Sequence, residues 1–137
     1  MSPITDIARQ FFIACEAGQG WDACHVYCTD NASFSAQAEP LADVTTLQTY
    51  CDWMKGLMTV LTDGHYILKS FATDIERQNV SAYAVFIGTH LAGGPCLPTG
   101  KTTHADYVYV MQFEGDKISH MTKIWNAGLT LKELGWA

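Results

Sequence analysis

The sequence predicts an α+β fold in which a cone-shaped, highly curved antiparallel sheet carries N-terminal helices on its concave face. Two observations predict this class. Apolar residues recur at helical spacing up to about residue 61, and from residue 65 the chain is rich in aromatic and β-branched residues. Strands of such length twist and bulge, so the sheet should roll into a half-open cone. No repeat or linker interrupts the chain, which predicts one domain over residues 1–137.

The first part of the chain is expected to be mostly helical. Gly18 and Gly20 should end the first helix, because glycine adopts the left-handed conformation found after helix ends. Thr45 and Thr46 can cap the third helix through their hydroxyl groups. The predicted segments are helices over 4–17 and 21–28, a brief strand over 31–35, and a helix from about 46 to 61.

Four long strands and a short closing helix are expected in the rest of the chain. Gln78-Asn79 and Gly115-Asp116 stand where hairpin turns should be. Consecutive hairpins imply an antiparallel meander. The predicted strands cover 65–76, 79–92, 101–115 and 117–127, and the helix covers 129–134.

The composition limits the classes of partner. Eight Lys and Arg stand against fourteen Asp and Glu, a net charge of −6, which argues against a nucleic-acid partner. No run of 18 apolar residues and no basic amphipathic stretch occurs, so no membrane partner is expected. The chain start lacks the features of a secretory signal, which predicts a cytoplasmic location.

The cysteines predict neither a disulfide framework nor a metal site. Their number, five, is odd, which favours free and mostly buried thiols. Cys24 and Cys28 lie one helical turn apart, but two thiols without a second Cys or His pair make a poor zinc site. Phosphate-binding and dinucleotide-binding motifs do not occur, so no cofactor is expected.

Four short motifs follow one another in the last third of the chain: Gly-Thr-His at 88–90, Pro-Thr-Gly at 98–100, Gly-Asp-Lys-Ile at 115–118 and Leu-Gly at 134–135. In this order they resemble the nuclear transport factor 2-like superfamily, and within it the SnoaL-like polyketide-cyclase branch. The resemblance implies a small-molecule pocket between sheet and helices. It also implies a homodimer formed through the outer face of the sheet.

The resemblance suggests catalytic candidates as well. In SnoaL-like cyclases a His and an Asp act as acid and base on an enolisable polyketide, and His90 matches the His position. The Asp position is occupied by Asn126, which has no titratable proton. Asn126 and Tyr109 would instead hold or polarise a carbonyl oxygen. Asp106, which shares a strand face with His104, would supply a carboxylate if it points inward.

The many aromatic residues suggest a flat, apolar or aromatic ligand. Most aromatic side chains are expected in the core, and some should line the pocket if the cone is partly empty. His120 would share that pocket if strand pleating is regular up to Asn126, whereas a bulge would reverse its direction. The predicted ligand-binding residues are Phe12, Trp53, Phe86, His120 and Trp125.

Three functions remain open at this point. The first is an enzyme of cyclase, isomerase or hydratase type that acts on an apolar carbonyl compound by acid-base chemistry. The second is a non-catalytic binding module for a hydrophobic metabolite, which Asn at the Asp position favours. The third is a structural dimerisation domain whose pocket is filled by side chains.

Overall fold

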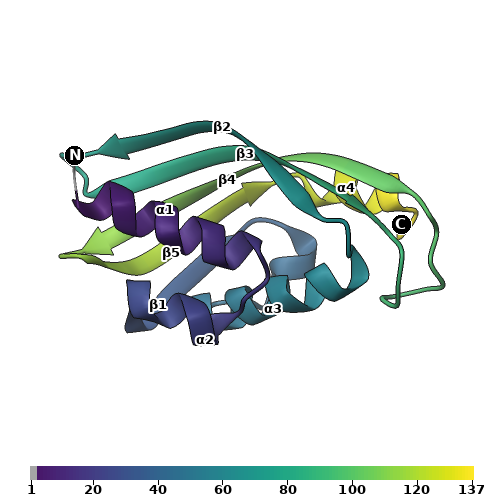
Figure 1. The fold of residues 1–137 in the computed structure, drawn as a ribbon, viewed down its shortest axis with the longest axis horizontal. Helices are drawn as coiled ribbons and strands as arrows, with labels where there is room; N and C mark the ends of the chain where they lie inside the picture. Colours follow the sequence, from purple (N-terminus) through teal and green to yellow (C-terminus); the bar gives the residue numbers. More distant parts are fainter. Residues whose placement is uncertain (1–2) are drawn as a thin grey trace.

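A five-stranded sheet carries the helices α1, α2 and α3 on one side, as Figure 1 shows for the computed structural model, which describes residues 3–137. The strand order is β1-β5-β4-β3-β2. The last four strands form the predicted antiparallel meander, whereas β1 pairs in parallel with β5, so the sheet is mixed rather than wholly antiparallel. The strands are β1 (Cys28–Ala36), β2 (His65–Asp74), β3 (Asn79–Thr89), β4 (Thr102–Glu114) and β5 (Lys117–Trp125).

The helices agree with the sequence pattern except at the second one. The predicted helix over 21–28 is shorter, because a 3-10 turn, His25–Tyr27, follows α2 and Cys28 already pairs with Ile118 in the sheet. Thr46 caps α3 as expected, and its hydroxyl accepts a hydrogen bond from the Thr49 backbone N–H at 3.1 Å. The α-helices are α1 (Pro3–Glu16), α2 (Trp21–Cys24), α3 (Leu47–Val60) and α4 (Ala127–Leu134).

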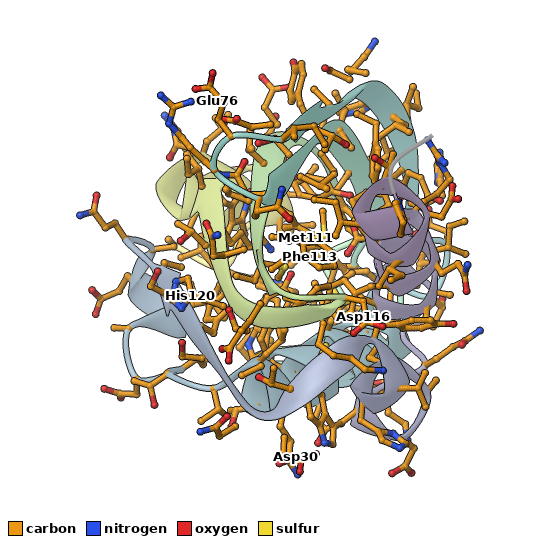
Figure 2. All side chains as sticks on the ribbon, turned by 90° about the vertical axis from the view of Figure 1, so that its left-hand side faces the viewer. Asp30, Glu76, Met111, Phe113, Asp116 and His120 are labelled. Carbon is orange, nitrogen blue, oxygen red and sulfur yellow. The ribbon has the colours of Figure 1, made fainter. Side chains whose placement is uncertain are left out.

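Strand β4 separates the two faces of the sheet by strict alternation. Its inward side chains are buried, and Met111 and Phe113 lie at the centre of the molecule in Figure 2. His104 and Asp106 occupy the intervening positions and are exposed. Because Asp106 points outward, it does not contribute a carboxylate to the interior.

A bulge in β5 decides which of its residues face inward. Gln112 pairs with His120 and Phe113 pairs with Ile118, which leaves Ser119 as an extra residue. Beyond the bulge, Lys123 lies opposite Tyr109, and both side chains are buried. His120 therefore lies on the outer face of the sheet, and Figure 2 shows it at the periphery.

The interior between α1, α3 and the sheet is dominated by aromatic residues. The Phe12 ring packs edge-on against Tyr109 with 5.6 Å between ring centroids, and Phe34 stacks on Tyr50 at 4.5 Å. Helix α4 follows β5 directly and packs against β4. Among residues 3–137, no helix is both long and apolar enough to span a membrane.

Candidate functional site

A cavity lies between the inner face of the sheet, helix α3 and helix α4. Its water-accessible volume is about 60 Å³, and its surface is almost entirely apolar. Helix α4 and the residue that follows its C-cap form one wall through Leu131, Leu134 and Trp136. The remaining lining residues are Glu16, Pro40, Trp53, Met54, Leu57, Leu61, Phe86, Ala105, Tyr107, Lys123, Trp125 and Thr130.

Glu16, the last residue of α1, brings a carboxylate into this apolar space. Its side chain is buried and accepts hydrogen bonds from two tyrosine hydroxyls of β4. Tyr107 donates to Oε1, and Tyr109 donates to Oε2 at 2.5 Å. Burial raises the pKa of Glu16, while the two tyrosine hydrogen bonds and the Lys123 charge oppose that rise. The carboxylate is thus a stronger base than an exposed glutamate and is also held in a fixed orientation.

Lys123 is the cationic counterpart of Glu16 and is also buried. Its Nζ donates a hydrogen bond to the Tyr50 hydroxyl at 3.1 Å. Aromatic rings surround the ammonium group, with the Trp125 centroid at 4.4 Å and the Trp53 centroid at 5.3 Å. Burial lowers the pKa of Lys123 to about 8, although the nearby Glu16 charge opposes this shift. Lys123 can therefore change protonation state near neutral pH.

Two tyrosines connect the two charged groups. The Tyr50 and Tyr109 hydroxyls are hydrogen-bonded to each other, so an unbroken chain of hydrogen bonds runs from Lys123 through both tyrosines to Glu16. When Glu16 is ionised, each hydroxyl donates toward it and each accepts from the Lys123 side. Burial raises the pKa values of both tyrosines, which keeps them protonated. Reversing every donor in this chain would move one proton from Lys123 to Glu16 without movement of any heavy atom.

Strand register explains why these residues meet. Tyr109 and Lys123 are direct partners across β4 and β5, and Tyr107 pairs with Trp125 on the same face. Glu16 follows the buried stripe of α1 at four residues beyond Phe12, which directs it toward the sheet. Neither the helix nor the strands alone would assemble the site.

The structure places four of the predicted residues in or beside the cavity. Phe86, Trp53 and Trp125 line it. Tyr109 belongs to the hydrogen-bond chain. Phe12 is buried behind Tyr109 and contacts its ring rather than the open space.

His90 lies outside the lining of the cavity, although it is fully buried. Its Nδ1 accepts hydrogen bonds from the Thr99 backbone N–H at 3.1 Å and from Trp136 Nε1 at 3.0 Å. Since Nδ1 is an acceptor, Nε2 carries the proton and donates to the Gly93 carbonyl at 2.6 Å. All hydrogen-bonding atoms of the ring are thus engaged in holding the 90–100 loop and the chain end together.

The other predicted polar residues are placed away from Tyr109. Asn126 caps α4, and its Oδ1 accepts from the Leu129 backbone N–H at 3.1 Å. Asp106 accepts a hydrogen bond from the Tyr83 hydroxyl at 3.1 Å on the outer face. His120, on the same outer face, is 2.7 Å from the Ser33 hydroxyl. The structure therefore does not gather these three residues around one ligand.

Sequence reasoning missed Glu16, Lys123, Tyr50 and Tyr107. The signal for Lys123 was its place between Met121 and Trp125, at the alternate positions of a strand whose inward residues are otherwise apolar. A charged residue at such a position is rarely accidental, because burial of a charge without partners is costly. The same argument applies to Glu16 on the apolar stripe of α1.

Comparisons with known proteins identify the fold. No protein-family model matches the chain, and no curated protein is similar to it. Among similar solved structures are a proposed SnoaL-like polyketide cyclase from Jannaschia sp. CCS1 (14% identity, TM-score 0.76, covering 100% of this chain and 97% of that one) and an NTF2-like protein from Burkholderia xenovorans LB400 (12%, 0.70, 96% and 95%). A third is TerC co-crystallized with polyporic acid (14%, 0.73, 98% and 99%). The chain thus has the nuclear transport factor 2-like α+β cone fold that its motifs implied.

Proposed function

We propose that this protein is a SnoaL-like enzyme that enolises a small apolar or aromatic carbonyl compound, as a cyclase or isomerase does. Glu16 is the base, and Lys123 stabilises the oxyanion that develops. The observation that carries the proposal is the chain of tyrosine hydroxyls that joins a buried acid and a buried base in an otherwise apolar cavity. In this assignment the acid-base role predicted for His90 passes to the Glu16–Lys123 pair.

The proposed reaction begins when the substrate carbonyl oxygen lies beside the Lys123 ammonium and its α-carbon faces Glu16. The C–H bond breaks, the proton moves to a Glu16 oxygen, and the electron pair moves onto the carbonyl oxygen. Lys123 stabilises that oxyanion strongly, because few other polar groups and little water share the cavity. Each Glu16 oxygen accepts one tyrosine hydrogen bond and therefore keeps a lone pair for the proton.

Two products can follow from the enolate. Return of the proton from Glu16 to a different carbon gives an isomer of the substrate. Attack of the enolate carbon on a second carbonyl of the same molecule gives a ring, and the new alkoxide then takes a proton from Lys123. The Tyr109 and Tyr50 hydroxyls then turn to donate toward Lys123, and the relay through them returns the Glu16 proton to Lys123, so the enzyme is regenerated without an external reagent.

The size of the cavity restricts the substrate. The open space holds about four water molecules, so an aromatic ring requires displacement of part of the wall. Helix α4 and Trp136 are the natural candidates, since they close the cavity from the end of the chain. The wall chemistry suits an apolar ligand, and the structural relative TerC was co-crystallized with an organic molecule, polyporic acid.

The test is exchange of α-hydrogens with solvent. Small aryl ketones and β-dicarbonyl compounds are incubated with the protein in D₂O, and deuterium uptake is followed by NMR. We expect Glu16→Gln to slow exchange by about 100-fold or more, and Lys123→Met to have a similar effect. The exposed residues Glu76 and Lys69 provide the matched controls Glu76→Gln and Lys69→Met, which should exchange like the parent protein.

The same experiment separates the enzyme from the binding module. Ligands that stabilise the protein but never gain deuterium would favour a non-catalytic module. Exchange that persists in Glu16→Gln would contradict the role of Glu16. Exchange lost in His90→Ala alone, with fold and cavity intact, would return the acid-base role to His90.

We also propose that the protein works as a cytoplasmic homodimer that pairs through the outer face of the sheet. That face carries partly exposed apolar side chains, including Ile124 and Tyr83, and reduced thiols persist in the cytoplasm. Sedimentation analysis tests the pairing: the protein should sediment as a dimer, and Ile124→Asp should convert it to a monomer. A monomeric parent protein at high concentration would refute the dimer.

A further inference from the structure

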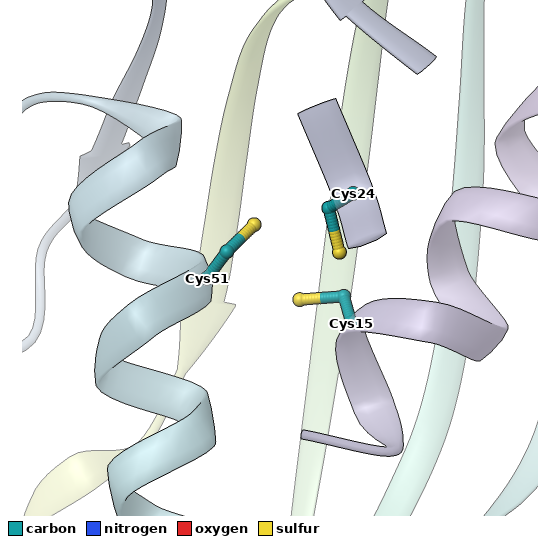
Figure 3. A group of neighbouring side chains, drawn as sticks. All are labelled: Cys15, Cys24 and Cys51. Atoms are coloured by element: carbon teal, nitrogen blue, oxygen red, sulfur yellow. The ribbon is translucent and has the colours of Figure 1, made fainter. Parts of the chain in front are cut away.

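Three cysteine side chains from three different helices converge beneath the sheet. Cys15 comes from α1, Cys24 from α2 and Cys51 from α3, and Figure 3 shows their sulfur atoms directed toward a common point. All three sulfurs lie within 4.8 Å of one another, and each residue is fully buried. Within residues 3–137, no other group of three His, Cys, Asp or Glu side chains has the spacing that a bound ion requires.

The spacing permits a three-coordinate centre. Three sulfurs bonded at about 2.3 Å to one pyramidal atom lie about 3.5 Å from one another, which is inside the 4.8 Å limit of this cluster. Cys28, the remaining buried cysteine, is oriented differently, because its thiol donates to the Cys24 backbone carbonyl at 3.5 Å. The cluster thus offers three sulfur ligands and no fourth.

Charge selects among the ions that bind thiols. A divalent ion held by three thiolates leaves a net charge of −1, and isolated charge in a buried apolar site is costly. The neighbouring Glu16 carboxylate would repel that charge, and the nearby cation Lys123 is already engaged with Tyr50. A trivalent centre with three thiolates is neutral and avoids this cost.

We propose that Cys15, Cys24 and Cys51 form a site for trivalent arsenic, which the protein takes up as arsenite. Arsenous acid is uncharged at neutral pH and reacts with the three thiols. Three S–H bonds and three As–O bonds break, three As–S bonds form, and three water molecules leave. Arsenic remains trivalent throughout, so the reaction needs no oxidant or reductant. The product is neutral, so no net charge is left in the protein interior.

Local structure around α2 offers arsenite a route to the buried thiols. Cys24 lies on a helix of only four residues, and this helix is preceded by Gly18 and Gly20, which both have positive φ. A helix of one turn that follows such positions opens at lower free energy than the long helices around it. One hydrogen bond joins the start of α2 to α3, from the Trp21 backbone N–H to Asp52 Oδ1 at 3.0 Å.

The test uses the full-length, reduced protein with sodium arsenite. Native mass spectrometry should show a single adduct whose mass equals one arsenic less three hydrogens. Arsenic X-ray absorption should show three sulfur neighbours and no oxygen. Two sulfur neighbours, or no adduct on the folded protein, would overturn the proposal without the use of any variant.

Variants then identify the ligands. The double variant Cys28→Ser/Cys96→Ser removes the two cysteines outside the cluster and should bind arsenite like the parent protein. Cys51→Ala should weaken binding by about 100-fold, with circular dichroism used to verify folding. Unchanged binding by a folded Cys51→Ala protein would contradict the assignment. Tighter binding of Cd²⁺ than of arsenite by the parent protein would refute the charge argument.

Discussion

Coupling between Glu16 and Lys123 provides the sharpest test of the tyrosine-linked site. The two groups do not contact each other directly, yet three consecutive hydrogen bonds connect them. Opposite charges joined by a chain of this kind attract each other by an amount on the order of 2 kcal/mol at an effective dielectric constant of about 20. Removal of either partner leaves the other charge buried without compensation, which is more costly than removal of both.

The assay is a double-mutant cycle on the free energy of unfolding. The parent protein, Glu16→Gln, Lys123→Met and the double variant are unfolded with urea at pH 7. We expect both single variants to be destabilised and the double variant to be more stable than their summed effects predict, by about 2 kcal/mol. A coupling energy below about 0.5 kcal/mol would mean that the two groups act independently, and the interpretation of the chain as one unit would fail.

Three further outcomes follow from the same contacts. The native pKa of Lys123 is about 8, below its value in the unfolded chain, so unfolding takes up a proton between pH 8 and about 10. The stability of the parent protein relative to Lys123→Met should therefore rise by about 3 kcal/mol over this interval in urea titrations. A constant difference would show that burial does not lower the pKa of Lys123. Tyr109→Phe removes the donor to Glu16 and the partner of Tyr50, so thermal unfolding should show a loss of about 1–3 kcal/mol together with slower α-hydrogen exchange, whereas unchanged exchange would argue against the relay. Asn126→Ala removes only the cap of α4 and should cost about 1 kcal/mol in the same unfolding assay without slowing exchange, and lost exchange in a stable variant would return Asn126 to the site.

The fold was predictable because its signals are local. The change from helical spacing to strand alternation near residue 65 separates the helices from the meander, and the start of β2 at His65 and the cap at Thr46 agree with that pattern. The parallel pairing of β1 with β5 was not predictable, because it joins segments far apart in the chain and depends on no local turn.

The site was harder to predict because it depends on strand parity and on tertiary contacts. The motif at 88–90 drew attention to His90, whose ring is occupied by the 90–100 loop and Trp136. One bulge, at Ser119, decides that Lys123 faces inward and His120 outward rather than the reverse, and sequence pattern alone does not locate a bulge. Helical spacing from Phe12 places Glu16 on the inward side of α1, but its contacts with Tyr107 and Tyr109 depend on how α1 packs on the sheet.

The bulge at Ser119 means that the chemistry of the cavity depends on the pairing of one strand as much as on its composition. With Ser119 retained but paired in regular alternation, every later residue of β5 would exchange faces. His120 and Thr122 would then face the helices, and Lys123 would move to the outer surface. Deletion of Ser119, by contrast, would restore regular pairing and leave these residues on their present faces. The one extra residue therefore decides whether the cavity is built on an ammonium group or on an imidazole.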